Sequence, residues 1–196
     1  MDGFAYRVSN YLVGNKDGEA VLEATLLGPE LEFHEAMTVA VTGANMKPEL
    51  NGWAIRMWES FEVKEGDRLS LEGAAAGIRS YIAFGGELDV EPVNNSKSTY
   101  VKTGIGGFQG RRLREGDEIP VRVPDDVLSG KYLASEHVPN YEKKTKIRVV
   151  LGPQDDYFTQ SGIRSFLNPQ GYRITKEADR MGYRLDGETI EHLDGA

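Results

Sequence analysis

The sequence contains no cysteine among its 196 residues. This absence excludes disulfides, thiolate zinc sites and cysteine nucleophiles. The sequence also lacks any apolar run close in length to the roughly 20 residues that a membrane-spanning helix needs. Its first residues, Met1 to Phe4, do not follow the basic and then apolar plan of a signal peptide. We therefore expect a cytoplasmic protein that makes no contact with a membrane.

Positive charge is scarce as well. Lys and Arg number 23 against 31 Asp and Glu, which gives a formal net charge of -8 and a pI near 5.0. Because affinity for nucleic acids depends on basic patches, this balance argues against a nucleic-acid partner. The one basic run, residues 143–148, is typical of a solvated linker. The three histidines show no ligand spacing, so we expect surface or core roles for them and no metal site.

Apolar periodicity predicts a mainly β chain with few short helices. Residues 3–13 have helical spacing and end at Gly14-Asn15, which indicates a short amphipathic helix with a glycine stop. The pair Asn51-Gly52 suits a type I′ hairpin, because both central residues of that turn have positive φ. Strands are expected at 20–27, 37–42 and 147–151, a short helix within 156–167, and a strand pair at 171–175 and 181–185. Short strands joined by Gly-rich turns favour an all-β barrel or sandwich over an α/β fold.

Two pairs of similar segments within the sequence bear on its domain organisation. Glu65-Gly66-Asp67 and Glu115-Gly116-Asp117 lie in similar surroundings and predict that one turn is used twice. Residues 50–55 also resemble residues 185–190, which suggests that a second, related unit begins near the C-terminus. Periodicity lapses between Pro124 and Lys146. We therefore predict a first subdomain at 1–123, a connection at 124–146, and the beginning of an incomplete second subdomain at 147–196.

The most glycine-rich region holds eight of the 23 glycines, between Gly77 and Gly116. Such a region is either dense in turns or admits a ligand close to the main chain. The loop Gly104 to Gly110 is similar to phosphate-binding loops, but no Gly-Lys-Ser/Thr follows it and no long helix begins at its end. We interpret this loop as turn architecture.

Candidate binding residues flank that loop. Arg79 and Tyr81 have the same parity in the predicted strand and point to one face, where Arg79 either anchors an anionic substrate or pairs with Asp89 or Glu87. Glu23, inside an apolar strand, is a candidate general base or a buried structural partner.

A second set of candidates lies downstream. One cation and three hydroxyls lie together in Ser96, Lys97, Ser98 and Thr99. This set of donors suits the binding of a carboxylate or a phosphate. The ordinary polarity of a solvated turn explains the same residues equally well. Arg180 and Tyr183 raise the same possibility in the second unit.

Several of these motifs, together with other segments, carry a family resemblance. The segments are residues 12–15, 22–29, 31–33, 41–44, 50–52, 77–86, 96–99, 106–117 and 179–185. The chain resembles the biotin-dependent carboxyltransferase family, also called allophanate hydrolase subunit 2, which includes the C subunit of 5-oxoprolinase and the Kip-type antagonist of a sporulation kinase inhibitor. The resemblance spans nearly the whole chain, although family members extend beyond it at both ends. Asn95 and Lys97 stand where Gly and Arg are typical, and Lys for Arg loses bidentate anion recognition.

The resemblance implies cyclophilin-like β-barrel subdomains, with the start of a second related barrel, and a hetero-oligomer with a subunit 1/B-type homologue. For the 5-oxoprolinase members it implies ATP-dependent opening of the 5-oxoproline lactam together with a third subunit. For the urea carboxylase relatives it implies transfer of a carboxyl group from carboxybiotin to an amide nitrogen.

We hypothesise that the chain is part of such an enzyme subunit, inactive alone, which binds a small amide, lactam or urea-type substrate through Arg79, the 96–99 cluster, Arg180 and Tyr183. The alternative is a non-catalytic regulatory module that binds a kinase-inhibitor partner.

Overall fold

The computed structural model describes residues 1–124, 129–142, 144, 146–168, 171–179 and 182–193. Its contacts divide the chain into two units, Asp2–Lys144 and Thr145–Ala196, the second grouped with Met1. Each unit has its own strands, and the first contains the larger core.

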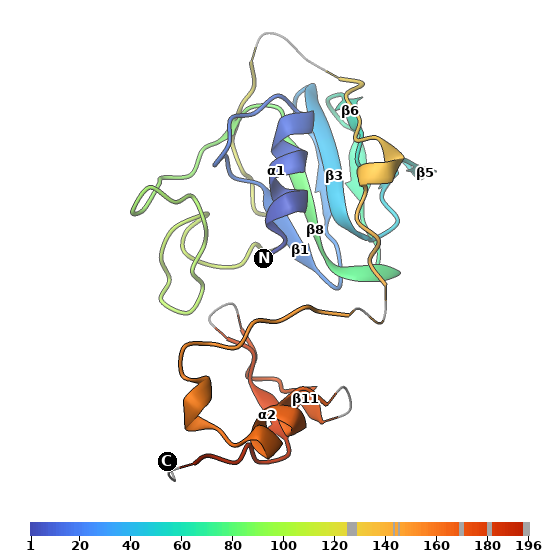
Figure 1. Cartoon of the computed structure of the whole chain (residues 1–196). Coiled ribbons are helices and arrows are strands. Elements are labelled where there is room, and N and C mark those ends of the chain that lie inside the picture. The colour runs from blue at the N-terminus through green and yellow to red at the C-terminus, as the bar shows by residue number, and fades with distance from the viewer. Residues whose placement is uncertain (125–128, 143, 145, 169–170, 180–181, 194–196) are drawn as a thin grey trace. The chain divides into compact units, whose positions relative to one another are not determined.

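The first unit is built on a four-stranded antiparallel sheet with the order β1-β8-β3-β6. Helix α1 (Gly3–Leu12) lies against β3 and β8 on one face of this sheet, as Figure 1 shows. The helix confirms the amphipathic pattern predicted for residues 3–13, and the Asp2 side chain caps its first turn by accepting from Ala5 N. The strands are β1 (Leu22–Thr25), β8 (Ala76–Phe84), β3 (Met37–Asn45) and β6 (Ser60–Val63).

A second four-stranded antiparallel sheet has the order β2-β7-β4-β5. Asn51 and Gly52 join β4 to β5 with φ angles of 52° and 80°, so both central residues of the predicted hairpin turn have positive φ. The strands are β2 (Glu30–Glu32), β7 (Arg68–Ser70), β4 (Glu49–Leu50) and β5 (Trp53–Ala54).

The core explains why β3 is buried over almost its whole length. Val39 and Val41 belong to the main apolar cluster, which also includes Leu69 of the second sheet, whereas Ala40 packs with Leu12 of α1. Successive side chains point to opposite faces of a strand, so a strand covered on both faces is apolar without alternation. The sheet that carries β3 is therefore covered on both sides.

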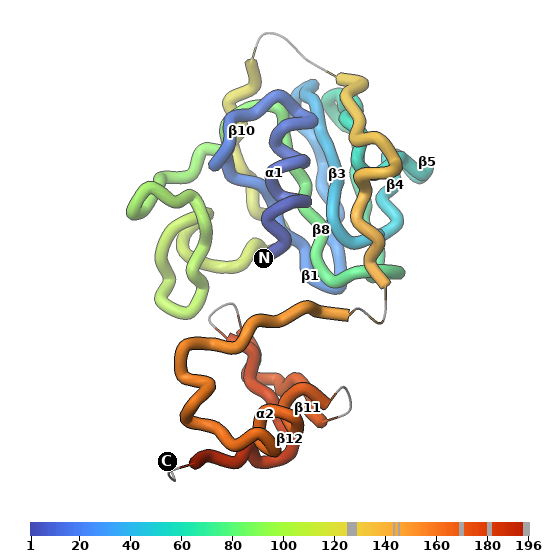
Figure 2. The backbone as a smooth tube through the Cα atoms, in the orientation of Figure 1, coloured from blue at the N-terminus to red at the C-terminus, as the bar shows by residue number. Residues whose placement is uncertain are grey.

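A long loop leaves this unit between β9 (Glu87–Leu88) and β10 (Val121–Arg122), which pair with each other. Figure 2 shows the loop extending away from the two sheets. The Glu-Gly-Asp turn is used twice, as predicted: the Asp67 carboxylate accepts from Lys64 N, and the Asp117 carboxylate accepts from Arg114 N. Farther on lies a short 3-10 helix, η1 (Ser135–His137).

The second unit is small. It contains η2 (Asp155–Tyr157), α2 (Gln160–Phe166) and a strand pair, β11 (Tyr172–Ile174) with β12 (Leu185–Gly187). The short helix and the first strand predicted for this part of the chain are present. The second predicted strand is placed too early: residues 182–184 form no strand, residue 181 lies outside the described residues, and β12 begins only at Leu185.

Two sequence predictions for this unit are wrong. Residues 147–151 form no strand, because no neighbouring strand pairs with them among the described residues, and Val150 is 96% exposed. The similarity between 50–55 and 185–190 does not reflect a shared structure, because Asn51-Gly52 form a turn whereas Asp186 and Gly187 lie in β12.

The mainly β prediction is confirmed, with two short α-helices and twelve strands in antiparallel pairing among the described residues. These strands form open sheets, and the described residues do not close into the barrel that the resemblance implied. In the same residues no helix is long and apolar enough to cross a membrane, and no cluster of side chains could hold a metal ion. His34, His137 and His192 are exposed.

Candidate functional site

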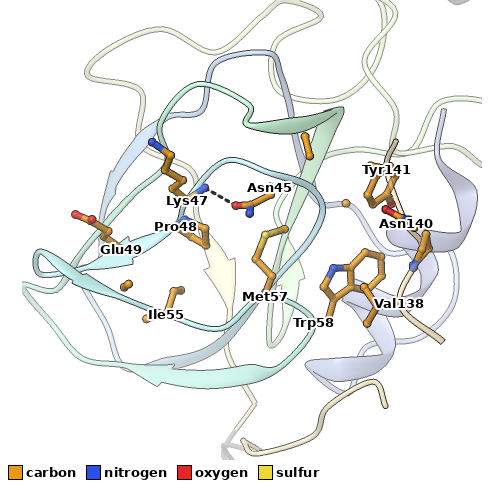
Figure 3. Close-up of a pocket in the computed structure, with 14 residues that line it drawn as sticks. Asn45, Lys47, Pro48, Glu49, Ile55, Met57, Trp58, Val138, Asn140 and Tyr141 are labelled. Atoms are coloured by element: carbon orange, nitrogen blue, oxygen red, sulfur yellow. Dashed lines mark hydrogen bonds between the residues drawn. The ribbon is translucent and has the colours of Figure 1, made fainter. Parts of the chain in front are cut away.

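A cavity of about 630 Å³ opens at the end of β3 in the first unit. We call it the Trp58 pocket. Its residues come from the end of β3 and the turn after it, from β4 and β5, from the turn before β6, and from residues 138–141 (Figure 3). Most of its wall is apolar and includes Pro48, Ile55, Met57, Trp58 and Val138.

The backbone of β3 creates the space for this pocket. The pairing of β3 with β8 shifts register between Gly43 and Asn45, so β3 carries a bulge where the pocket begins. Gly43 has a φ of 86°, and a Cβ atom there would lie 2.4 Å from the Arg79 carbonyl oxygen. Only glycine fits that position without displacing β8.

Trp58 forms the pocket wall in a strained conformation. Its φ is 63°, in the left-handed region that a bulky side chain rarely occupies, and its side chain is nearly buried. Two backbone hydrogen bonds hold it there, from Trp58 N to Val41 O at 2.8 Å and from Leu133 N to Trp58 O at 2.9 Å. Strain of this kind costs about 1–3 kcal/mol and concentrates at ligand sites. The conformation of Trp58 therefore marks the pocket as the candidate functional site.

Three polar side chains at the pocket have fixed partners. Asn45 Oδ1 accepts from Lys47 N at 2.9 Å, and Lys47 Nζ lies 2.9 Å from Glu72 Oε2. Asn140 Nδ2 donates to Glu142 Oε1 at 2.8 Å. The cation of the pocket is thus already paired, while each asparagine makes no hydrogen bond with the other end of its amide within the part of the chain that the structure describes.

Tyr141 connects the pocket to a partly buried polar chain. Its hydroxyl donates to Asp2 Oδ2 at 2.6 Å, and its ring lies over Gly77, where an added Cβ would approach Tyr141 Cγ to 3.3 Å. Asp2 N in turn donates to the Tyr81 hydroxyl at 2.9 Å. Part of the segment predicted as a connection, residues 131–141, therefore packs on the first unit, with Val138 and Tyr141 against Trp58 and Tyr81.

The same chain reaches Arg79. Tyr81 is opposite Glu23 in the β1 and β8 register and shares a hydrogen bond with its carboxylate, and Arg79 Nε lies 3.4 Å from Glu23 Oε1. Arg79 and Tyr81 do share one face of β8, as their parity predicts. The partner of Arg79 is Glu23, however, and neither Glu87 nor Asp89, which pairs with Arg122 instead.

The Ser96 to Thr99 cluster contains a second, largely buried ion pair. Lys97 Nζ lies 2.7 Å and 2.9 Å from the two carboxylate oxygens of Glu19, whose backbone oxygen accepts from Tyr6 and Asn10 of α1. Ser96 Oγ accepts from Ser98 N, and Ser96 and Ser98 are exposed. Lys97 therefore ties the long loop to the start of the chain.

The remaining predicted site residues belong to the second unit. Tyr183 is about half exposed there. Arg180 lies outside the residues that the structure describes.

Comparison with known proteins identifies the family. The sequence matches the family described as carboxyltransferase domain, subdomain A and B, over residues 1–195. The chain belongs to this family. This carboxyltransferase domain is 33% identical to the C subunit of 5-oxoprolinase from Escherichia coli over 97% of its own length and 60% of that protein. The chain therefore spans about three fifths of that relative.

Larger proteins contain a similar region. A putative urea carboxylase of Emericella nidulans is 33% identical over 95% of this chain and 15% of its own length. The crystal structure of the urea amidolyase of Kluyveromyces lactis superposes with a TM-score of 0.88, at 30% identity, over 99% of this chain and 12% of that chain. The mainly β architecture of the carboxyltransferase domain is thus shared with solved relatives.

Sequence reasoning did not select Asp2, Asn45, Trp58 or Tyr141 of the carboxyltransferase domain. Asp2 and Tyr141 are 139 residues apart, so no local pattern joins them. A left-handed Trp has no sequence signal, because glycine and asparagine are the residues that favour this conformation. The closest signal was Gly77, whose place in the glycine-rich region is explained by the Tyr141 ring that packs over it.

The hydroxyl groups of Tyr81 and Tyr141 should lose their protons at a higher pH than an ordinary tyrosine does, because the pKa of each is raised. Burial first, and then the hydrogen bond and the charge of Asp2, raise the pKa of Tyr141, and burial raises the pKa of Tyr81 to about 12. An unfolded tyrosine has a pKa near 10.0, so the stability that these groups contribute is complete below pH 10 and is lost as the pH rises through the folded pKa, which is about 12 for Tyr81. We expect Asp2→Asn to lower the pKa of Tyr141, as measured by tyrosinate absorbance during an alkaline titration.

Two controls accompany this titration. Tyr141→Phe should remove the part of the absorbance change that shifts to lower pH in Asp2→Asn. Asp156→Asn removes the same charge from the exposed surface of the second unit and should leave the ionisation of Tyr141 unchanged. An unchanged ionisation of Tyr141 in Asp2→Asn would show that the Asp2 carboxylate does not act on Tyr141.

Proposed function

We propose that this carboxyltransferase domain is part of a hetero-oligomeric enzyme that processes a small amide, lactam or urea-type substrate together with a subunit 1/B-type homologue. The observation that carries the proposal is the Trp58 pocket, a mostly apolar cavity with a few fixed polar groups, which is the usual form of a small-molecule site. Family membership supports the reaction class, since the relatives are named as a 5-oxoprolinase subunit and as a putative urea carboxylase.

ATP and carboxybiotin are the co-substrates implied for the assembled complex. Neither fits the Trp58 pocket of this chain as it stands. A triphosphate needs several cations or backbone donors, and the carboxylate of carboxybiotin needs at least one, whereas Lys47, the single cation of the pocket lining in the described part of the chain, is paired with Glu72. We therefore propose that ATP or carboxybiotin binds elsewhere in the assembled complex, and that the Trp58 pocket of this chain binds and orients the amide substrate.

The predicted anion site stays a second part of the proposal. Lys97 is held by two hydrogen bonds to Glu19. Arg79 Nε, in contrast, is buried 3.4 Å from Glu23 Oε1 without a hydrogen-bond partner among the described residues. A bound anion would compete with each carboxylate for the cation. A cation held in this way is preorganised for charge that develops during a reaction. The proposal is that the Ser96 to Thr99 cluster and Arg79 stabilise such charge in the assembled enzyme.

Reconstitution tests this function. The full chain is mixed with its subunit 1/B-type partner and the third subunit, ATP and 5-oxoproline are supplied, and glutamate is measured; urea with carboxybiotin is the parallel reaction. We expect turnover in one of the two, and at least about a tenfold loss with the double variant Lys97→Ala and Ser98→Ala. Tight pairwise binding without turnover in either reaction would instead indicate a regulatory module, and full activity of the double variant would remove the 96–99 cluster from the site.

A further inference from the structure

The Trp58 pocket has a polar pattern of its own. Figure 3 shows Asn45 at the pocket edge, with its amide oxygen turned to Lys47 N. This hydrogen bond fixes the orientation of the amide and leaves Asn45 Nδ2 as a donor. Asn140 is fixed in the opposite sense, because its Nδ2 donates to Glu142 Oε1 and its Oδ1 is left as an acceptor. The described residues that line the pocket therefore include one amide donor and one amide acceptor, both on exposed side chains.

Among the described residues that line the pocket, Lys47 is the cation and Glu49 the anion. Lys47 Nζ lies 2.9 Å from Glu72 Oε2, a carboxylate outside the lining, so the cation is already paired and the charge of Glu49 is left over. A ligand carboxylate would find no uncompensated cation among these residues and would meet the Asn140 carbonyl oxygen without a proton to share. A neutral amide has both a carbonyl oxygen for Asn45 and an N–H for Asn140.

The apolar wall completes the pattern. Met57 and the nearly buried Trp58 form part of the apolar lining, and Tyr141 lies on the same side of the pocket as Trp58 (Figure 3). The Tyr141 ring is fixed by its bond to Asp2, so this wall is held in place before a ligand arrives.

We propose that the Trp58 pocket binds a neutral, planar amide or cyclic amide and selects it against the corresponding carboxylate, with Asn45 as donor and Asn140 as acceptor. This inference rests on the proposed function and narrows its substrate class to the uncharged members. A lactam that also carries a carboxylate needs a separate site, outside this pocket, with a cation for the carboxylate.

The test uses two probes that differ in charge, 5-oxoproline and its primary amide, added to the full chain without partner or ATP. The variant Trp53→Phe serves as background, because it removes the 79% exposed tryptophan and leaves Trp58 as the fluorescent reporter. We expect the amide to bind with a Kd of about 1 mM, as suits a ligand of few atoms, and the acid at least about tenfold more weakly.

Asn45→Asp is the decisive variant, because its carboxylate still accepts from Lys47 N but replaces the donor with a negative charge. It should weaken amide binding at least about tenfold. Asn94→Asp, an exposed position with positive φ in the long loop, adds the same charge outside the pocket and should leave binding unchanged.

Three outcomes would overturn the inference: equal binding of the two probes, no binding of either, or an unaltered Kd in Asn45→Asp. Because the assay needs no turnover, its result is independent of the reconstitution experiment. Amide binding without turnover in any complex would overturn the proposed function and leave the pocket's selectivity standing.

Discussion

Gly43→Ala is expected to destabilise the first unit by roughly 3–5 kcal/mol. The left-handed backbone at φ 86° costs an L-residue about 1–2 kcal/mol. The new Cβ would also lie 2.4 Å from the Arg79 carbonyl oxygen and 3.2 Å from Ser80 Cα, both backbone atoms of β8 that cannot rotate away. The clash opens the β3 and β8 ladder at the bulge that forms the Trp58 pocket.

Gly66→Ala provides a matched control for this substitution. Gly66 has nearly the same φ, 85°, and no atom lies within 4 Å of the place that a Cβ would take there. It should therefore show the conformational cost alone, about 1–2 kcal/mol. Denaturant unfolding of both variants separates strain from steric clash, and equal losses would contradict the contact with β8.

Ile82→Ala is expected to cost roughly 2–5 kcal/mol. Ile82 is fully buried in β8, where it is opposite Leu22 of β1 and Val41 of β3. Truncation removes the buried methyl groups and leaves a cavity between the two sheets, which the surrounding β strands can fill only in part.

The control for this prediction lies in the same strand. Ile78 is 52% exposed, so Ile78→Ala should cost less than about 1 kcal/mol. The two positions share residue type and strand, and they differ in burial. Comparable losses of the free energy of unfolding would mean that the sheet-to-sheet core is not where the stability of this unit resides.

Local patterns were sufficient for much of the fold. The apolar spacing of residues 3–13 located α1, Asn51-Gly52 located the hairpin turn, and strand parity placed Arg79 and Tyr81 on one face. Each of these depends on residues within one element, where side-chain geometry follows directly from backbone geometry.

The site depended on contacts that no local pattern contains. The composition of the 96–99 cluster suggests a cation open to a ligand, but Lys97 meets Glu19 from a part of the chain 78 residues away. Residues 147–151 have the composition of a strand, but a strand forms only where a neighbour supplies hydrogen bonds. Trp58 owes its conformation to the bonds that Val41 and Leu133 make with its backbone, and these are set by the whole sheet.

The bond between Tyr141 and Asp2 has a kinetic consequence. It joins residues 139 positions apart, whereas the β3 and β8 ladder joins strands within residues 37–84. The entropy of loop closure rises with loop length, so near contacts form before distant ones. We therefore expect the sheets to assemble while one side of the pocket is still open, and the Tyr141 side of the pocket to form only after residue 141 of a newly made chain has emerged and returned to the first residues.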